Sequence, residues 1–219
     1  MAEIANAVTL GRAELSIIEA VKARADFTHV SWSSEDLEPV RATIREYYRR
    51  EQRGICAYCR GPVSIRGALN CHLEHIAPKS KYLDFMFDPK NLCVICADCN
   101  TIKRDQEALA QEPETVLDIG KPRKRYPRTT SAFLIVHPHF DQWDDHIQKV
   151  GKYFVDKTPK GHFTIGACVL NRHLRQFGWE LPLVDDAAMR DAMTAYLNTN
   201  DPVAKAAALV HLMRLMNQI

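Results

Sequence analysis

The sequence predicts an α+β fold in which a small strand–strand–helix unit is flanked by helices on both sides. Two CxxC pairs, Cys56/Cys59 and Cys96/Cys99, bracket a segment that contains two short apolar runs of strand length. Apolar residues at helical spacing occur near both ends of the chain. Together these observations place short strands at the centre of the protein and helices around them.

The N-terminal part is expected to be helical. Apolar residues repeat every three or four positions over residues 11–27, which is typical of an amphipathic helix. A second helix is expected over residues 34–52, with Ser34 as a plausible N-cap. Gly54 is suited to ending that helix, because glycine readily adopts the left-handed conformation found just beyond a helix C-terminus.

The central part is expected to hold two strands followed by a helix. Residues 68–76 and 91–95 each predict a strand, and Pro78 ends the first of them. The helix is expected to begin at Asn100 and to run towards Gln111. Residues 112–130 contain several prolines and a glycine, which predicts an irregular surface segment.

The C-terminal part predicts further small elements and then helices. Residues 132–136 form an apolar run, and residues 150–168 suggest a hairpin that turns at Pro159-Lys160-Gly161. Three helices are then expected at 170–177, 186–198 and 203–217, the last capped by Asp201 and started by Pro202. We therefore divide the chain into a helical flank (1–53), a core (54–111) and an α+β extension (112–219) that is mainly helical after residue 170.

Composition places the chain among ordinary globular proteins. It has 219 residues, of which 46% are hydrophobic, and a formal net charge of +2. No apolar run approaches the 18 residues that would suggest a membrane span. The N-terminus lacks a basic flank before a long apolar run, so we expect a cytoplasmic protein. The seven cysteines then indicate reduced thiols and a metal site rather than disulfides.

The four paired cysteines predict a structural zinc ion. Thiolates suit Zn²⁺, and two residues between paired cysteines let both sulfurs reach one tetrahedral ion. Cys71 and Cys93 lie on the predicted strands, and Cys168 has no partner at metal-site spacing, so these three are expected to be small core residues.

Basic residues gather at two places. Lys103 and Arg104 follow the second CxxC pair. A second group lies in the irregular segment and consists of Lys121, Arg123, Lys124 and Arg125, with Arg128 beyond it. Such groups are either solvated surface or a surface that contacts phosphate. The interpretation as a phosphate-contacting surface depends on which residues lie between the two CxxC pairs.

The enclosed residues give the chain a resemblance to the HNH endonucleases, a family built on a ββα-metal motif. The resemblance covers roughly residues 54–106. Asn100 stands where many members have the final histidine, and Glu74 stands where aspartate is more usual. The matching residues, in chain order, are Glu74-His75-Ile76, Pro78-Lys79-Ser80, Asn91-Leu92 and Cys96-x-x-Cys99-Asn100-x-x-Lys103.

Phosphodiester hydrolysis explains why these residue types occur together. His75 titrates near neutrality and can accept a proton from water. Glu74 and Asn100 offer oxygen ligands, which favour Mg²⁺ or Mn²⁺ over zinc. By resemblance, Asn91 orients the His75 imidazole through a hydrogen bond. Lys79, Lys103, Arg104 and the second basic group are the candidate nucleic-acid contacts.

A looser resemblance links the flanks to the small HNH subunits of bacterial anti-phage operons, either the PtuB-like component of Septu systems or the HNH component of Zorya-type systems. It rests on residues 133–141 and 161–165. It implies a DNA endonuclease that works with an ATPase or another defence subunit. Two alternatives stay open: a non-catalytic zinc module that binds nucleic acid or protein, and an RNase or nuclease toxin.

The remaining histidines are expected to be mainly structural. His72 shares a strand face with Glu74, and we expect it to support the site rather than to bind metal. His137 and His139 belong to a second polar cluster. A second metal site is conceivable there, but we expect these residues to pack against the core or to line a DNA groove.

Overall fold

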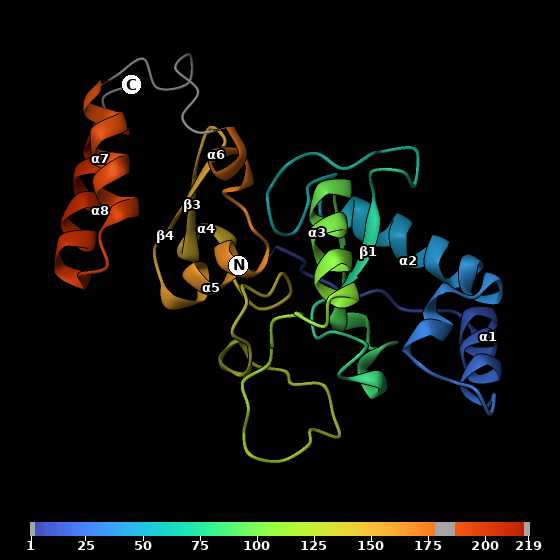
Figure 1. Cartoon of the computed structure of the whole chain (residues 1–219). Coiled ribbons are helices and arrows are strands. Elements are labelled where there is room, and N and C mark those ends of the chain that lie inside the picture. The colour runs from blue at the N-terminus through green and yellow to red at the C-terminus, as the bar shows by residue number, and fades with distance from the viewer. Residues whose placement is uncertain (1–2, 178–186, 217–219) are drawn as a thin grey trace. The chain divides into compact units, whose positions relative to one another are not determined.

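The computed structural model describes residues 3–177 and 187–216 (Figure 1). Their mixed helix and strand content agrees with the predicted α+β class. The described chain forms two compact units: unit 1 holds residues 3–148 and 156–170, and unit 2 holds 149–155, 171–177 and 187–216. The division into 1–53, 54–111 and 112–219 stays a prediction. No helix in these described ranges is both long enough and apolar enough to cross a membrane.

Two helices open unit 1. Helix α1 spans Arg12–Lys22, and α2 spans Glu38–Glu51. Helix α2 begins later than predicted because short 3₁₀ turns occupy His29–Ser33 and Glu35–Leu37. Ser34 precedes the second turn, but its side chain accepts no capping hydrogen bond. Gly54 lies just after α2 with φ +72°, as expected for a residue that ends a helix.

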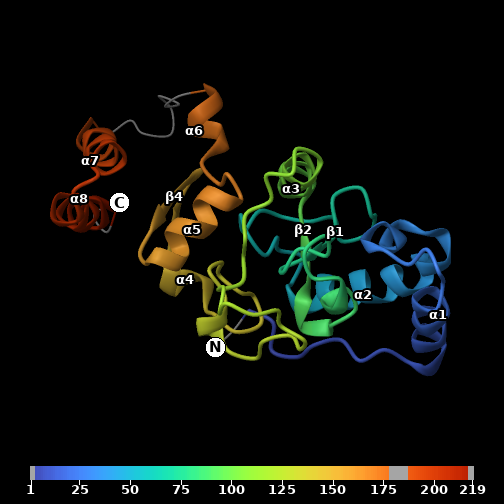
Figure 2. The ribbon, with the colours of Figure 1, turned by 60° about the horizontal axis from the view of Figure 1, so that its bottom comes forward.

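The two central strands form an antiparallel pair. Strand β1 spans His72–His75 and β2 spans Leu92–Ile95, with Glu74 opposite Cys93. Helix α2 lies on one side of this pair and α3 (Ala97–Ala108) on the other (Figure 2). The edge of β2 that does not face β1 is bound by the side chain of Gln52. Its amide nitrogen donates to the Val94 carbonyl, and its amide oxygen accepts from Val94 N–H. Helix α2 therefore fixes the strand from which α3 departs.

In this central part, the predicted extent of the first strand and the predicted start of the helix both differ from the structure. Strand β1 is shorter than 68–76, because the backbone turns before it and Cys71 N–H donates to the carbonyl of Ala68. Helix α3 begins at Ala97 and not at Asn100, because Cys96 is its N-cap residue. Asn70 Oδ1 accepts a hydrogen bond from Ala97 N–H at 2.7 Å and so satisfies a free donor of the first turn.

The hairpin predicted around Pro159-Lys160-Gly161 was wrong. Those residues begin helix α5 (Pro159–Ala167), with Thr158 as N-cap accepting a hydrogen bond from Gly161 N–H. Threonine followed by proline often starts a helix, whereas a turn was predicted at these residues. The observed hairpin is shorter and comes earlier, with strands β3 (Ile147–Val150) and β4 (Tyr153–Asp156).

The apolar run at 132–136 is not a regular strand. A 3₁₀ turn covers Thr130–Ala132, and Phe133 makes a single bridge with Val116. The nearby histidines do pack against the core, as predicted. His139 Nε2 lies 2.8 Å from the carbonyl oxygen of Leu92, and His137 Nε2 lies 2.7 Å from the Tyr126 hydroxyl. Helix α4 (Trp143–His146) follows this segment.

Unit 2 is built around an antiparallel helical pair. Helix α6 spans Arg172–Phe177, α7 spans Ala187–Asn198 and α8 spans Pro202–Met216. Residue 186, the predicted start of α7, and residue 217, the predicted end of α8, lie outside the described residues. Asp201 caps α8 as expected, since its carboxylate accepts from Ala204 N–H at 2.8 Å. The buried core residues of this unit are Tyr153, Val155, Met189, Ala192, Met193, Tyr196 and Leu212.

Candidate functional site

The two CxxC pairs come together as the spacing predicts. All four sulfur atoms lie within 4.8 Å of one another, and all four residues are buried. Cys56 and Cys59 lie in the turn after α2, whereas Cys96 and Cys99 lie at the start of α3. Four sulfurs about 2.3 Å from one tetrahedral ion would be separated by about 3.8 Å. The cluster therefore fits a single metal ion that ties the turn to the helix.

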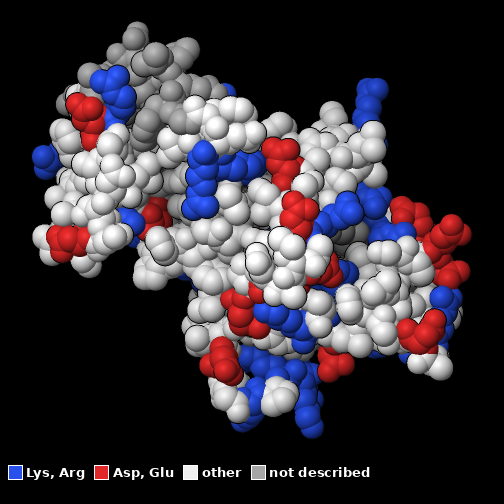
Figure 3. Space-filling model, viewed as in Figure 1, with Lys and Arg blue, Asp and Glu red and all other residues white. Residues whose placement is uncertain are grey.

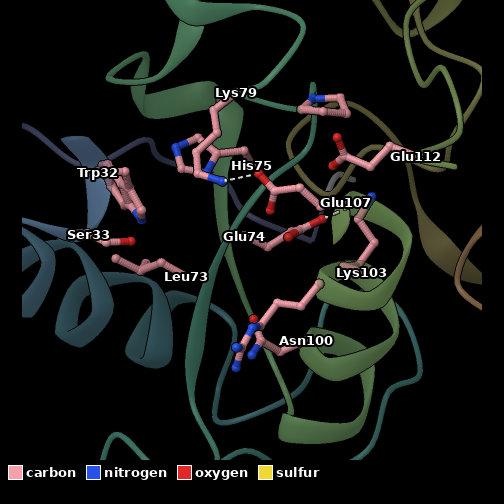
Figure 4. Close-up of a pocket in the computed structure, with 12 residues that line it drawn as sticks. Trp32, Ser33, Leu73, Glu74, His75, Lys79, Asn100, Lys103, Glu107 and Glu112 are labelled. Atoms are coloured by element: carbon pink, nitrogen blue, oxygen red, sulfur yellow. Dashed lines mark hydrogen bonds and ion pairs between the residues drawn. The ribbon is translucent and has the colours of Figure 1, made fainter. Parts of the chain in front are cut away.

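A pocket of about 220 Å³ lies between β1 and α3 (Figure 4). Its wall holds six of the residues predicted from the sequence. Glu74 and His75 come from β1, Lys79 from the following loop, and Asn100, Lys103 and Arg104 from α3. Residues that lie far apart in the sequence thus face one shared space, with oxygen ligands, an imidazole and cations side by side.

His75 is held so that one ring nitrogen remains available. Its Nε2 lies 3.1 Å from the carbonyl oxygen of Met86, which can only accept a hydrogen bond, so Nε2 must carry the proton. The lone pair is then on Nδ1, which has no hydrogen-bond partner among the described residues. Burial, helped by the positive charge of Lys79, lowers the pKa of His75 to about 3. The ring is therefore neutral at neutral pH and its Nδ1 lone pair is unprotonated; the expectation that His75 titrates near neutrality was wrong, because burial makes this imidazole a weaker base.

Glu74 forms a buried ion pair inside the pocket. Its Oε1 lies 3.3 Å from Nζ of Lys103, and both side chains are at most 10% exposed. Burial raises the pKa of Glu74, and Lys103 partly opposes this rise. Burial also disfavours the charge of Lys103, but Glu74, together with Cys168 and Glu112, outweighs this effect and raises the pKa of that amine. A divalent ion at Glu74 would have to share the carboxylate with this ammonium group.

Asn91 does not contact the His75 imidazole, so the orienting role assigned to it was wrong. Its amide oxygen accepts from Ala77 N–H at 2.7 Å, and its nitrogen donates to the carbonyls of Ala77 and Phe85. Asn91 therefore fixes both ends of the loop that runs from His75 to Met86. It can therefore act on the imidazole indirectly, through Met86 beside Phe85 and through Ile76, whose N–H donates to the Asn91 carbonyl at 2.9 Å.

Replacing Asn91 by alanine is expected to destabilise unit 1. The change removes the side-chain partner of the buried Ala77 N–H and of the Ala77 carbonyl, and each orphaned buried group costs about 1–3 kcal/mol; the Phe85 carbonyl loses one of its two donors and keeps Asp88 N–H. Denaturant unfolding should show a total loss of about 3 kcal/mol or more. As a control, Asn70→Ala removes a helix-cap contact at the other end of β1 and should cost only about 1 kcal/mol. An Asn91→Ala protein as stable as the wild type would contradict this assignment.

Glutamates from the last turn of α3 and from the segment after it bind the loop after His75. Lys79 Nζ lies 2.9 Å from Glu107 Oε1, and the Ser80 hydroxyl donates to the Glu112 carboxylate. The Tyr82 hydroxyl donates to Glu114 at 2.9 Å. These contacts immobilise the loop, but they also place carboxylates where a phosphate would meet Lys79.

The structure separates the predicted nucleic-acid contacts into two groups. Lys79, Lys103 and Arg104 line the pocket. The second basic group, Lys121, Arg123, Lys124 and Arg125, lies outside its wall, in the loop at the lower edge of Figure 1. Figure 3 shows Lys and Arg gathered at that place. This second group therefore offers an exposed cationic surface and does not belong to the pocket itself.

Sequence reasoning missed several residues of the pocket wall, among them Trp32, Glu107 and Glu112. Glu107 could have been found, because it follows Asn100 and Lys103 at helical spacing on one face of α3. Trp32 carried no such signal, since it reaches the pocket from a 3₁₀ turn about forty residues upstream of His75.

Comparison with known proteins agrees with this geometry. Residues 56–106 match the family model described as HNH endonuclease. This range contains all four clustered cysteines and strands β1 and β2, so this part of the chain matches the HNH domain of a nuclease family. A comparison with curated proteins found no significant match.

Proposed function

We propose that the protein is a metal-dependent DNA endonuclease whose reaction takes place in the pocket between β1 and α3. The observation that carries this proposal is the arrangement at His75. A neutral imidazole whose Nδ1 has no hydrogen-bond partner among the described residues lines a pocket whose wall also holds Glu74 and Asn100. A general base must be held in one tautomer and left free at one nitrogen, and His75 meets both conditions.

The chain's own residues divide the work of hydrolysis. His75 Nδ1 takes the proton from the attacking water. Glu74 and Asn100 are the residues that would hold Mg²⁺ or Mn²⁺, because both supply oxygen ligands to the pocket. Such an ion supplies Lewis-acid stabilisation of the phosphate and of the departing oxygen. Lys79, Lys103 and Arg104 add positive charge that orients the phosphate before reaction.

The four cysteines are proposed to hold a structural Zn²⁺ ion. Their side chains fill all four positions of a tetrahedral site, which leaves no open position for water or substrate. Their role is to hold the start of α3 against the turn after α2, so that Asn100 and Lys103 face β1.

The substrate class can be tested in one assay. Supercoiled plasmid, linear duplex, single-stranded DNA and RNA are each incubated with the purified protein and Mg²⁺ or Mn²⁺. We expect cleavage of DNA, and the plasmid products distinguish nicking from double-strand cutting. Cleavage of RNA alone would favour the ribonuclease or toxin alternative. Binding without cleavage of any substrate would favour a non-catalytic module.

Replacing Glu107 by glutamine is expected to strengthen DNA binding. The change removes the carboxylate that pairs with Lys79 and frees this cation for a phosphate. Because partly exposed ion pairs contribute about 0.2–1 kcal/mol, the dissociation constant should fall about 2- to 5-fold at low salt. Fluorescence anisotropy with labelled duplex measures this change.

The double variant Glu107→Gln/Lys79→Ala is the matched control, and it should lose the gain. If the isosteric Glu107→Gln protein binds DNA no more tightly than the wild type, Lys79 does not contact phosphate.

We further propose that the protein acts in the cytoplasm as an anti-phage effector together with an ATPase or another defence subunit. The exposed basic loop and the flanks outside the matched range support a role that needs more than the HNH domain. Co-expression with a co-encoded ATPase, followed by gel filtration, should yield a stable complex. Elution as a free monomer in every fraction would overturn the partnership but not the nuclease activity.

A further inference from the structure

The imidazole of His75 is in contact with a tryptophan from outside the HNH-matched range. The ring centroids of Trp32 and His75 are 4.5 Å apart, with an interplanar angle of 78°. Trp32 is only 7% exposed and forms part of the pocket wall, where Figure 4 shows it beside His75. Residues 56–106 therefore do not contain the whole surroundings of the proposed base.

Trp32 is itself held firmly. The guanidinium group of Arg41 donates hydrogen bonds to the carbonyl oxygens of Trp32 and Ser34, and it also pairs with Glu38. These contacts attach the 3₁₀ turn His29–Ser33 to helix α2. On its other side, Trp32 packs against Phe87 at 5.9 Å between centroids. Arg41 thus holds the backbone of Trp32, and Phe87 packs against its indole.

A histidine ring turns about its Cβ–Cγ bond, and one hydrogen bond at Nε2 restrains this rotation only in part. His75 has one such bond, from Nε2 to Met86. Contact with a fixed aromatic ring removes this freedom, and aromatic pairs in such a tilted arrangement contribute about 0.5–1.5 kcal/mol beyond burial. Trp32 also shields part of the imidazole from water, and His75 is only 7% exposed.

We propose that Trp32 is a positioning residue for His75, so that the N-terminal flank completes the active site of the HNH domain. This inference rests on the proposed function of His75 as the base. It means that the 3₁₀ turn and α2 are part of the catalytic apparatus, although neither lies in the matched range.

Steady-state kinetics of Trp32→Leu, Trp32→Phe and Phe27→Leu test the proposal. A misplaced catalytic group costs up to about 100-fold, so Trp32→Leu should lower kcat about 10- to 100-fold while KM and DNA affinity stay within about 2-fold. Trp32→Phe should recover most of the lost kcat, because it restores a ring beside His75. Phe27 stacks on Phe87 but does not touch His75, so Phe27→Leu is the control that should retain wild-type kcat.

Nuclear magnetic resonance of the His75 ring nitrogens gives a readout that is independent of turnover. We expect one Nε2–H tautomer in the wild type, and exchange broadening or mixed tautomers in Trp32→Leu. A folded Trp32→Leu protein with wild-type kcat and an unchanged His75 spectrum would overturn the inference. So would an equal loss of kcat in Phe27→Leu. If the wild type cleaves nothing, the proposed function fails, and the spectrum alone still decides whether Trp32 positions His75.

Discussion

His75→Ala is expected to abolish detectable DNA cleavage while leaving the fold and DNA binding in place. The substitution removes Nδ1, the one unpaired acceptor of the buried imidazole. Loss of a general base typically costs about 10²- to 10⁴-fold in rate. Plasmid cleavage under single-turnover conditions measures the loss, and anisotropy with the same DNA confirms that binding is retained.

His72→Ala is the matched control for this experiment. His72 lies three residues earlier on the same strand, and its Nε2 lies 3.0 Å from the carbonyl oxygen of Leu69, in the turn that precedes β1. It lies outside the pocket wall, so its loss should change the rate less than about 3-fold. Substantial residual cleavage by a folded His75→Ala protein would refute the assignment of the base.

Cys96→Ser is expected to cause the largest loss of stability of any single change considered for unit 1. Structural zinc sites contribute to folding directly, with binding free energies of about 10–16 kcal/mol in small zinc-dependent peptides. Cys96 is also the N-cap residue of α3, so releasing it frees the helix that carries Asn100 and Lys103. We expect loss of bound zinc and a melting temperature lowered by about 10 °C or more.

Cys71→Ser provides the comparison for that variant. Cys71 is fully buried but lies outside the four-cysteine cluster. Placing a hydroxyl group there should cost about 1–3 kcal/mol without any loss of metal. Zinc content by mass spectrometry and thermal unfolding by circular dichroism separate the two effects. A Cys96→Ser protein that melts like the wild type would show that the cluster is not a structural metal site.

Much of the candidate site could be predicted because its residues lie close together in the sequence. Glu74 and His75 are adjacent on one strand, and the CxxC spacing places Asn100 and Lys103 on the first turns of α3. The match over residues 56–106 covers the same local unit. Local spacing of this kind is readable, since strand and helix periods determine which side chains share a face.

The rest of the site depends on contacts across long stretches of sequence. Trp32 reaches His75 from a 3₁₀ turn, which has no periodic signal. The partners of Asn91 are backbone groups of a loop, and no side-chain pattern identifies them. The start of α5 was missed for a different reason: Thr158-Pro159 was treated as part of a turn, although the same residues cap helices.

The most direct test of the account is metal-dependent cleavage with zinc retained. The purified protein is dialysed to remove weakly bound divalent ions, its zinc content is verified, and supercoiled plasmid is added with Mg²⁺, with Mn²⁺, or with neither. Because Glu74 and Asn100 offer oxygen ligands and the four cysteines offer only sulfur, the account predicts cleavage with either added ion and none without. Equal cleavage in all three samples would contradict it.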